Sequence, residues 1–227
     1  MSGKLFICAT PIGNLEDASF RLISTLQTVD LILAEDTRRT QILLKHFHVQ
    51  KPIKCLEAHR ERAMLSWVLE QLKSGKNLAL LSDAGTPGIS DPGGELIPFL
   101  IRENIQVDYI PGPSSVIAAL ILSGLPMHSF LFHAFPPSKP SARRKLFQNL
   151  SHLKTTLIFF ESPKRLLNSL KDMLEILGDR PAAVCRELTK IHQEVLRGNL
   201  SQLVEVLGER KTIKGEITVV VSGSVGS

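Results

Sequence analysis

Short apolar runs that alternate with helical patterns constrain the fold of this chain more than any other feature of its sequence. Strand-like runs in the first half lie at residues 4–9, 30–34, 77–81 and 106–110. Helical patterns lie between them at residues 17–27, 37–47, 62–74 and 94–103. Strands that alternate with helices indicate a parallel or mixed sheet with helices on its faces. We therefore expect an α/β fold.

The second half differs because its short strands are more frequent. Its strand-like runs lie at residues 130–135, 155–160, 181–186 and 216–221. Its helical patterns lie at residues 114–123, 142–152, 163–177 and 201–206. Lys214-Gly215 reads as a hairpin-like lead-in to the last strand, and the pattern favours a second α/β domain with a mixed sheet. We expect a domain boundary near Pro111–Pro113, domains at residues 1–112 and 113–223, and a disordered tail at 224–227.

The composition is that of a globular protein. With 227 residues, 43% of them apolar, the chain can bury one large core or two small ones. No apolar run reaches the roughly 20 residues that span a bilayer, and the N-terminus lacks the pattern of a signal peptide. Cys8, Cys55 and Cys185 are odd in number and far apart. We therefore expect reduced thiols and a cytoplasmic location.

The positive charge is gathered in clusters. The formal net charge is +5, and most clusters of Lys and Arg border turns that contain glycine or proline. Two interpretations are open: ordinary solvated faces, or a surface that follows the phosphates of a nucleic acid.

Five strand-like runs end in unusual turns. These turns are Ala9–Asn14, Ser82–Pro87, Pro111–Ser115, Glu161–Pro163 and Arg186–Thr189. Ligands of α/β sheets bind beyond the carboxyl ends of the strands. Glycine lets backbone groups approach a ligand closely, and proline fixes the turn around it. The five turns together predict one shared ligand crevice.

Several well-known motifs are missing from the sequence. No GxGxxG or GxxxxGK[ST] follows a strand, which argues against a dinucleotide fold and a P-loop. No HExxH or CxxC is present, so we expect no metal site. The absence of GxSxG weakens the case for a serine hydrolase.

Six segments occur in the order in which one enzyme family carries them. They are ATPIGNLED, AEDTRRT, SDAGTPGISDPG, PGPSS, FFESPKRL and RELTKIHQEVLRG. From Leu5 to about Val221, the chain resembles the small-subunit ribosomal RNA cytidine 2′-O-methyltransferases. That family belongs to the tetrapyrrole methylase-like, class III enzymes that use S-adenosylmethionine. The resemblance implies two α/β domains with the donor in a deep cleft between them, a homodimer, and small-subunit ribosomal RNA or the assembled subunit as partner.

The resemblance also implies a donor site, without a metal, around the turn after Leu81. Its residues, carried over motif by motif, are Ile12, Ser82, Asp83, Ala84, Ser114, Ser115, Phe160 and Leu188. The donor is a zwitterion that contains a sulfonium. Fixed backbone dipoles and an acidic group suit it better than a phosphate nest does.

Methyl transfer to a ribose hydroxyl requires a group that removes the hydroxyl proton. Asp36, Glu161 and Glu187 are the candidate bases, and Lys190 joins them if burial lowers its pKa. Arg38 is expected to position a phosphate or to order an acidic neighbour.

Basic residues beside these turns are the candidates for contacts with RNA. They are Arg39, His59, Arg143, Arg144, Lys164 and Arg165. His59 is also a possible base. The chain departs from the family's pattern at Arg39, Arg60, His133 and Lys164, where RNA would be read.

Two other functions are open on the sequence. One is a methyltransferase of the same superfamily that acts on a tetrapyrrole or another small molecule, since a polyanionic ring would also suit the basic clusters. The other is a non-catalytic RNA-binding relative, which binding of the donor would separate from an enzyme.

Overall fold

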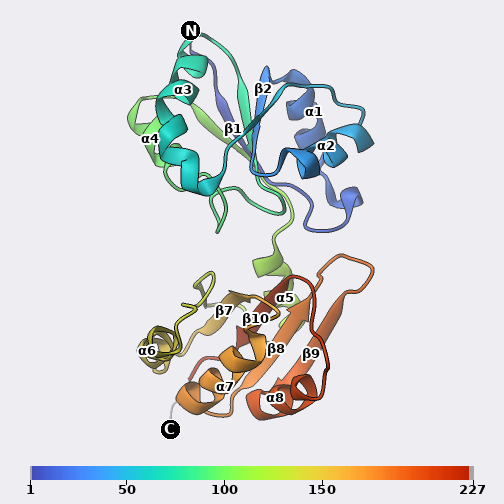
Figure 1. Cartoon of the computed structure of the whole chain (residues 1–227), viewed down its shortest axis with the longest axis vertical. Coiled ribbons are helices and arrows are strands. Elements are labelled where there is room, and N and C mark those ends of the chain that lie inside the picture. The colour runs from blue at the N-terminus through green and yellow to red at the C-terminus, as the bar shows by residue number, and fades with distance from the viewer. Residues whose placement is uncertain (1, 225–227) are drawn as a thin grey trace. The chain divides into compact units, whose positions relative to one another are not determined.

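The computed structural model describes residues 2–224 and contains two compact α/β units, one up to Ser114 and the other from Ser115 onward (Figure 1). The division lies two residues after the expected boundary. Both units are α/β, so the predicted fold class is confirmed.

The first unit is built on a five-stranded, all-parallel sheet with the strand order β3-β2-β4-β1-β5. Its strands are β1 (Leu5–Cys8), β2 (Leu31–Ala34), β3 (Ile53–Cys55), β4 (Leu78–Leu81) and β5 (Val107–Ile110). Its helices are α1 (Phe20–Thr28), α2 (Thr37–His46), α3 (Glu61–Lys73) and α4 (Leu96–Arg102), with short 3₁₀ turns at Leu15–Asp17 and Ala58–Arg60.

Helices cover both faces of this sheet (Figure 1). Ala79 and Leu81 of β4 pack into a cluster with α1 and α2, whereas Leu78 and Leu80 pack into a second cluster with α3 and α4. A strand that is buried on both faces reads as a continuous apolar run instead of an alternating one. That is why β4 was recognisable as LALL, all four residues of which are buried.

The second unit has a mixed sheet with the strand order β6-β7-β10-β8-β9, in which only β6 and β7 are parallel. Its strands are β6 (Phe130–Phe132), β7 (Thr156–Glu161), β8 (Pro181–Arg186), β9 (Glu194–Asn199) and β10 (Ile217–Val221). Its helices are α5 (Ser115–Ser123), α6 (Pro140–Leu150), α7 (Leu166–Leu177) and α8 (Leu200–Gly208).

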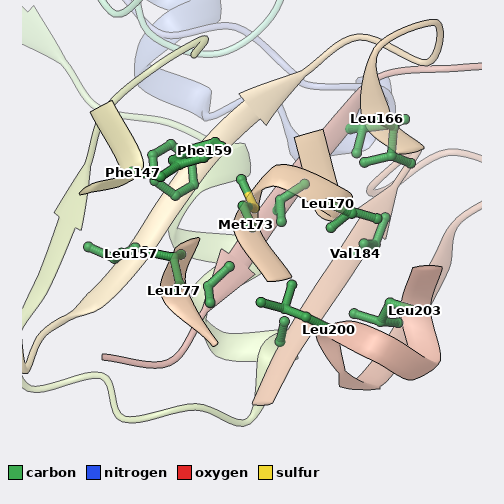
Figure 2. Close-up of a cluster of buried hydrophobic side chains, with 14 of the residues drawn as sticks. Phe147, Leu157, Phe159, Leu166, Leu170, Met173, Leu177, Val184, Leu200 and Leu203 are labelled. Carbon is green, nitrogen blue, oxygen red and sulfur yellow. The ribbon is translucent and has the colours of Figure 1, made fainter. Parts of the chain in front are cut away.

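One face of the second sheet is covered by α6, α7 and α8, and Figure 2 shows the core between them. Phe147 of α6 meets Phe159 of β7 edge to face, with ring centroids 5.6 Å apart. Met173 and Leu170 of α7 and Leu203 of α8 complete the layer. On the opposite face, α5 packs against β8, β9 and β10.

Two strands were missed by the sequence analysis, and one turn was interpreted wrongly. β3 has three residues, and β9 is a polar edge strand that ends in Arg197-Gly198-Asn199, so neither has the apolar pattern of a central strand. Lys214-Gly215 forms no hairpin, because the element before it is α8 and β10 pairs with β7 and β8. The expected tail at 224–227 lies, apart from Ser224, outside the described residues.

Among the described residues, no helix is both long and apolar enough to cross a membrane.

Candidate functional site

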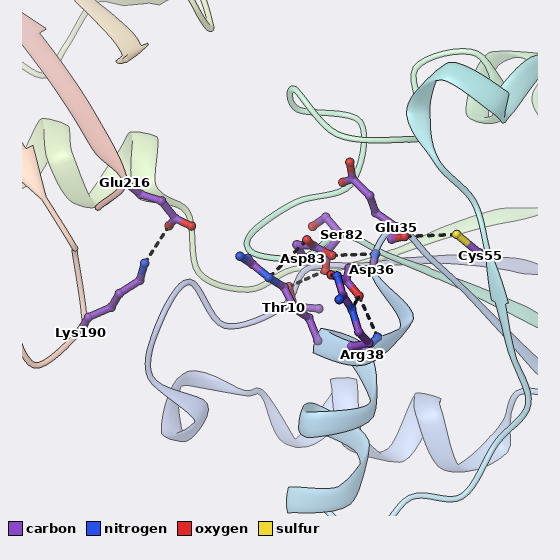
Figure 3. Close-up of polar contacts among 10 residues, drawn as sticks. Thr10, Glu35, Asp36, Arg38, Cys55, Ser82, Asp83, Lys190 and Glu216 are labelled. Atoms are coloured by element: carbon purple, nitrogen blue, oxygen red, sulfur yellow. Dashed lines mark hydrogen bonds and ion pairs between the residues drawn. The ribbon is translucent and has the colours of Figure 1, made fainter. Parts of the chain in front are cut away.

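The turns after β1 and β4 are joined at the carboxyl edge of the first sheet. Thr10 and Gly85 form an isolated bridge, in which each backbone N–H donates to the other's carbonyl, at 2.8 and 3.1 Å. Ser82 Oγ donates to the Gly85 carbonyl at 3.1 Å, and Thr10 Oγ1 donates to the Ser82 carbonyl at 3.3 Å. The two turns therefore form one hydrogen-bonded unit, which Figure 3 shows around Thr10 and Ser82.

Glycine is favoured at two points of this edge. Gly85 has φ +85°, a left-handed conformation that favours glycine. A Cβ at Gly112, in the turn after β5, would lie 3.1 Å from both the carbonyl oxygen and the Cβ of Ala9. A side chain at position 112 would therefore crowd Ala9, so the close approach of the third turn to the first favours glycine there.

Asp83 joins the turn after β2 to this group. Its Oδ1 accepts the Asp36 backbone N–H at 3.0 Å, and its Oδ2 lies 3.6 Å from Arg39 Nε. The Asp83 carboxylate thus has two partners within the chain, and its predicted contact with the methyl donor stays a prediction. Four strand ends thus meet at one edge, which accounts for the glycine and proline in their turns.

Asp36 is a helix cap. Its carboxylate accepts the backbone N–H of Arg38 at 2.9 Å and both arms of the Arg38 guanidinium at 3.0 and 2.8 Å. These hydrogen bonds lower the pKa of Asp36 to about 2. A carboxylate held in its charged form by these partners accepts a proton poorly, which favours a capping role for Asp36; its role as a base stays a prediction. Arg38 pairs with the acidic neighbour Asp36, which is one of the two roles expected for it.

Glu35 was missed as a candidate base, although it directly follows β2. It is half-buried, and its carboxylate forms no hydrogen bond or ion pair within the described chain (Figure 3). Burial raises the pKa of Glu35, the nearby carboxylates of Asp83, Asp36 and Glu57 raise it further, and Arg39 opposes them. An unengaged carboxylate with a raised pKa has the properties of a general base.

Glu61 is a second residue that the sequence analysis passed over. Its side chain is 5% exposed, and Oε1 accepts backbone N–H groups of Gly93, Glu95 and Leu96 at 3.0, 3.1 and 2.6 Å. These groups lie at the start of α4, where unpaired donors attract a negative charge. Glu61 therefore fixes the far end of the long segment that begins at Ser82.

In the second unit, the ends of β7 and β8 lie on either side of the start of β10. Ile217 pairs with Glu161 on one side and with Arg186 on the other. The Glu161 side chain is fully buried. It accepts hydrogen bonds from Ser162 N at 2.8 Å and from the Ser169 hydroxyl, and it pairs with Arg165 at 2.8 Å. Both of its oxygens are buried and have partners within the chain, which favours a structural role for Glu161; its role as a base stays a prediction.

Glu187, Lys190 and Glu216 form an ion cluster in the turn after β8. Lys190 Nζ lies 2.9 Å from Glu187 Oε1 and 3.1 Å from Glu216 Oε2. Figure 3 shows the contact between Lys190 and Glu216. Burial alone would lower the pKa of Lys190, but the two carboxylates raise it. Burial alone would raise the pKa of Glu187, but Lys190 and the Glu216 N–H lower it. Lys190 was a candidate base only if burial lowered its pKa, and that condition is not met. Glu187 is held by Lys190 and the Glu216 N–H, and its role as a base stays a prediction.

The same turn contains a buried hydroxyl without a partner. Thr189 Oγ1 is the one buried side-chain polar atom among the described residues that forms no hydrogen bond. Thr189 and Glu187 both have left-handed backbones, with φ +64° and +51°. Leaving a buried polar group unpaired costs about 1–3 kcal/mol. Leu188, the preceding residue, is predicted to contact the methyl donor. A hydroxyl without a hydrogen-bond partner at this position fits a bound polar ligand.

The remaining predicted donor residues are distributed over both units. Ile12 and Ser82 are buried at the edge of the first sheet, and Ala84 is half-buried beside them. Ser114 ends the first unit, and Ser115 is the first residue of α5. Phe160 packs against Phe132 and Phe135, and Leu188 is 6% exposed. That these residues bind the donor stays a prediction.

Two of the predicted RNA contacts are structural. Arg143 is 4% exposed and pairs with Asp172 at 2.6 Å, so it joins α6 to α7 and cannot reach RNA. Arg165 forms an ion pair with the buried carboxylate of Glu161. Arg144 is partly exposed, but it pairs with both Asp172 and Glu175. Exposed side chains are found at three positions, Arg39, His59 and Lys164.

Cys8 and Cys185 are buried, whereas Cys55 is exposed. The described thiols are free, and burial raises the pKa of Cys8 to about 12 and that of Cys185 to about 11. Among the described residues, no group of three His, Cys, Asp or Glu side chains is placed to hold a metal ion.

Comparisons with known proteins agree with this architecture. The family model of the Tetrapyrrole (Corrin/Porphyrin) Methylases matches residues 4–204. A Ribosomal RNA small subunit methyltransferase I from Thermotoga maritima is 47% identical over 221 residues, 97% of this chain and 99% of that protein. The solved structure of the methyltransferase CobJ is similar with a TM-score of 0.75 at 16% identity, covering 99% of this chain and 98% of that one.

A second solved structure is similar with a TM-score of 0.66 at 18% identity. It is uroporphyrin-III C-methyltransferase from Thermus thermophilus in complex with S-adenyl homocysteine, and the likeness covers 96% of this chain and 97% of that one. At these identities, the two solved structures establish the shared fold.

Proposed function

The chain belongs to the tetrapyrrole methylase family and, within it, to the ribosomal RNA small subunit methyltransferases I, and we propose that it methylates the 2′-hydroxyl of a cytidine in small-subunit ribosomal RNA. The observation that carries the proposal is the identity to the Thermotoga maritima methyltransferase along nearly the full length of both chains. The methyl donor is S-adenosylmethionine, in keeping with the product-like ligand in the Thermus thermophilus structure.

We assign the donor to the joined turns of the first unit, and we keep Leu188 and its neighbour Thr189 as predicted contacts of the donor. When bound, the donor supplies an electrophilic methyl group on a sulfonium. The chain supplies fixed backbone groups around Ser82–Gly85 and the unpaired hydroxyl of Thr189. Preorganised groups of this kind cost little reorganisation when charge shifts during a reaction.

Glu35 is the residue to which we assign the ribose proton. It follows β2 at the edge where the other turns meet, and its carboxylate is unengaged. A correctly placed base contributes about 10²–10⁴-fold to the rate, and alignment of the reactants contributes up to roughly 7–11 kcal/mol. The caps and ion pairs at Asp36, Glu161 and Lys190 hold the surrounding backbone in place.

Methyl transfer from radiolabelled S-adenosylmethionine tests the proposal. Small ribosomal subunits that lack the modification are the first substrate, with naked ribosomal RNA and a tetrapyrrole precursor in parallel. Label that survives alkali and interrupts the cleavage ladder at one cytidine is the expected result. Label in the tetrapyrrole and not in the RNA would show that the substrate is a tetrapyrrole. Binding of S-adenosylmethionine without methyl transfer to either form of the RNA would refute the proposed function.

A homodimer and a cytoplasmic location stay predictions. Sedimentation of the purified protein at several concentrations tests the first, and fractionation of cells tests the second.

A further inference from the structure

One segment carries the whole net charge of the chain. Residues 37–54 contain five Lys and Arg residues and no Asp or Glu. The chain has 27 basic and 22 acidic residues, so the rest holds 22 of each and is formally neutral. The five cations are Arg38, Arg39, Lys45, Lys51 and Lys54.

Part of this segment lines an open groove of about 920 Å³ in the first unit. One wall is a face of α2, with Thr37, Gln41 and Lys45 at helical spacing, together with His48 in the turn after the helix. The other wall is the segment that leads into the edge strand β3, and it includes Lys51. No acidic side chain lines the groove.

The cations of the groove differ from the arginines that precede them. Arg38 and Arg39 pair with Asp36 and Asp83. Lys45 is exposed and Lys51 is half-buried, and within the described chain neither forms an ion pair or a side-chain hydrogen bond. Their charge is therefore not neutralised within the chain.

The backbone fixes the turn that follows α2 in the wall of the groove. His48 has φ +53°, and the turn is held by hydrogen bonds from His48 N to Lys45 O and from Val49 N to Leu44 O, at 3.3 and 2.9 Å. Histidine is among the residues that enter the left-handed region more often than most. The lysine at the end of α2 and the one beyond the turn therefore belong to one fixed surface.

The groove starts next to the proposed site. Thr37 follows Asp36, and Glu35 lies one residue earlier at the end of β2. α2 has ten residues and is therefore about 15 Å long, which corresponds to about four nucleotides at the 3.4 Å rise of a duplex strand.

We propose that this groove along α2 binds the phosphate backbone of the RNA substrate beside the nucleotide that is methylated. The proposal rests on the proposed function. Unpaired lysines supply the charge that phosphates require, and the Thr, Gln and His side chains supply polar groups that contact phosphate and sugar without reading sequence.

The test compares two double variants. Lys45→Gln with Lys51→Gln removes both groove charges, whereas Lys76→Gln with Arg102→Gln removes two exposed charges near the amino edge of the same sheet. Binding of a short fluorescein-labelled single-stranded RNA is measured over a range of salt concentrations. Donor binding by calorimetry shows that each variant is folded.

The groove variant is expected to bind RNA about tenfold more weakly at low salt, and its slope of log affinity against log salt falls by about 1.4, or 0.7 for each lost phosphate contact. In methyl transfer, its KM for RNA rises while kcat and donor affinity stay unchanged. The control variant keeps the wild-type slope.

Three outcomes overturn the proposal. In the first, the salt slope of RNA binding is unchanged in the groove variant. In the second, the control variant loses as much RNA affinity and slope as the groove variant. In the third, the groove variant changes sedimentation but not RNA binding, which would show that a second copy of the chain covers the groove. Failure of the proposed function is separate. In that case the wild type transfers no methyl group to RNA, while the difference in slope between the two variants still decides whether the groove holds phosphates.

Discussion

Glu61 offers the sharpest test of how this structure is stabilised. One of its oxygens accepts three backbone N–H groups at the start of α4, and two of those hydrogen bonds, to Gly93 and Leu96, are buried. Glu61→Ala leaves both donors without a partner. Each unpaired buried donor costs about 1–3 kcal/mol, so we expect a loss of about 4 kcal/mol in the free energy of unfolding.

Glu61→Gln provides the intermediate case. The amide oxygen still accepts hydrogen bonds, but it lacks the charge that makes hydrogen bonds to ionised groups stronger by about 1 kcal/mol each. Three bonds to one oxygen are not fully additive, so we expect a loss of about 2 kcal/mol. Glu70→Gln, an exposed position on the same helix, is the control and should change the stability by less than about 0.5 kcal/mol.

The assay uses the single tryptophan, Trp67, which lies in α3 and reports on the first unit. Urea unfolding followed by its fluorescence gives the free energy, and hydrogen exchange follows the amides of Gly93 and Leu96. A Glu61→Ala variant within about 1 kcal/mol of wild type, with both amides still protected, would refute the role given to this carboxylate.

Four further outcomes are expected. Glu35→Gln should lower kcat by about 10²–10⁴-fold with donor affinity unchanged. Because a base acts deprotonated and the pKa of Glu35 is raised, the wild-type kcat should rise through an acid limb above the usual glutamate pKa, and the variant should lack that limb; a retained limb assigns the base elsewhere. The pKa of Asp36 is lowered to about 2, so its charge stabilises the folded state fully above the ordinary pKa of 3.8 and less as pH falls toward 2. The difference in melting temperature between wild type and Asp36→Asn should therefore shrink across that window, and a constant difference would contradict it. Arg143→Ala should cost about 3 kcal/mol in urea unfolding, because Asp172 loses a buried partner, and should leave the salt dependence of RNA binding unchanged. Thr189→Val should stabilise the fold by about 1 kcal/mol while weakening donor binding measured by calorimetry; equal donor affinity would show that the hydroxyl does not touch the donor.

The parts of the fold that follow from local rules could be predicted. β4 was evident because both of its faces are buried, and the turn after it because Gly85 needs a left-handed backbone. β9 was missed because an edge strand in contact with solvent has a mixed composition. Its place is decided by pairing with β8, which the sequence does not display.

The choice among acidic residues could not be made from the sequence. Asp36, Glu161 and Glu35 all stand at or just after strand ends, and nothing in the sequence shows which of these carboxylates lacks a partner in the folded chain. What separates them is their partners: a cap and an arginine for Asp36, a buried serine and an arginine for Glu161, and no hydrogen-bonded partner for Glu35. These partners come from helix starts and turns whose side-chain directions only the folded chain fixes.

The concentration of net charge in residues 37–54 also bears on how fast this protein meets its substrate. A formally neutral remainder neither attracts nor repels a polyanion at long range, so the field of this one segment would orient the molecule before contact. Association would then slow steeply as salt shortens the Debye length from about 30 Å at 0.01 M to about 8 Å at 0.15 M, while the rate of dissociation changes less. The same eighteen residues would set both the direction of approach and its dependence on ionic strength.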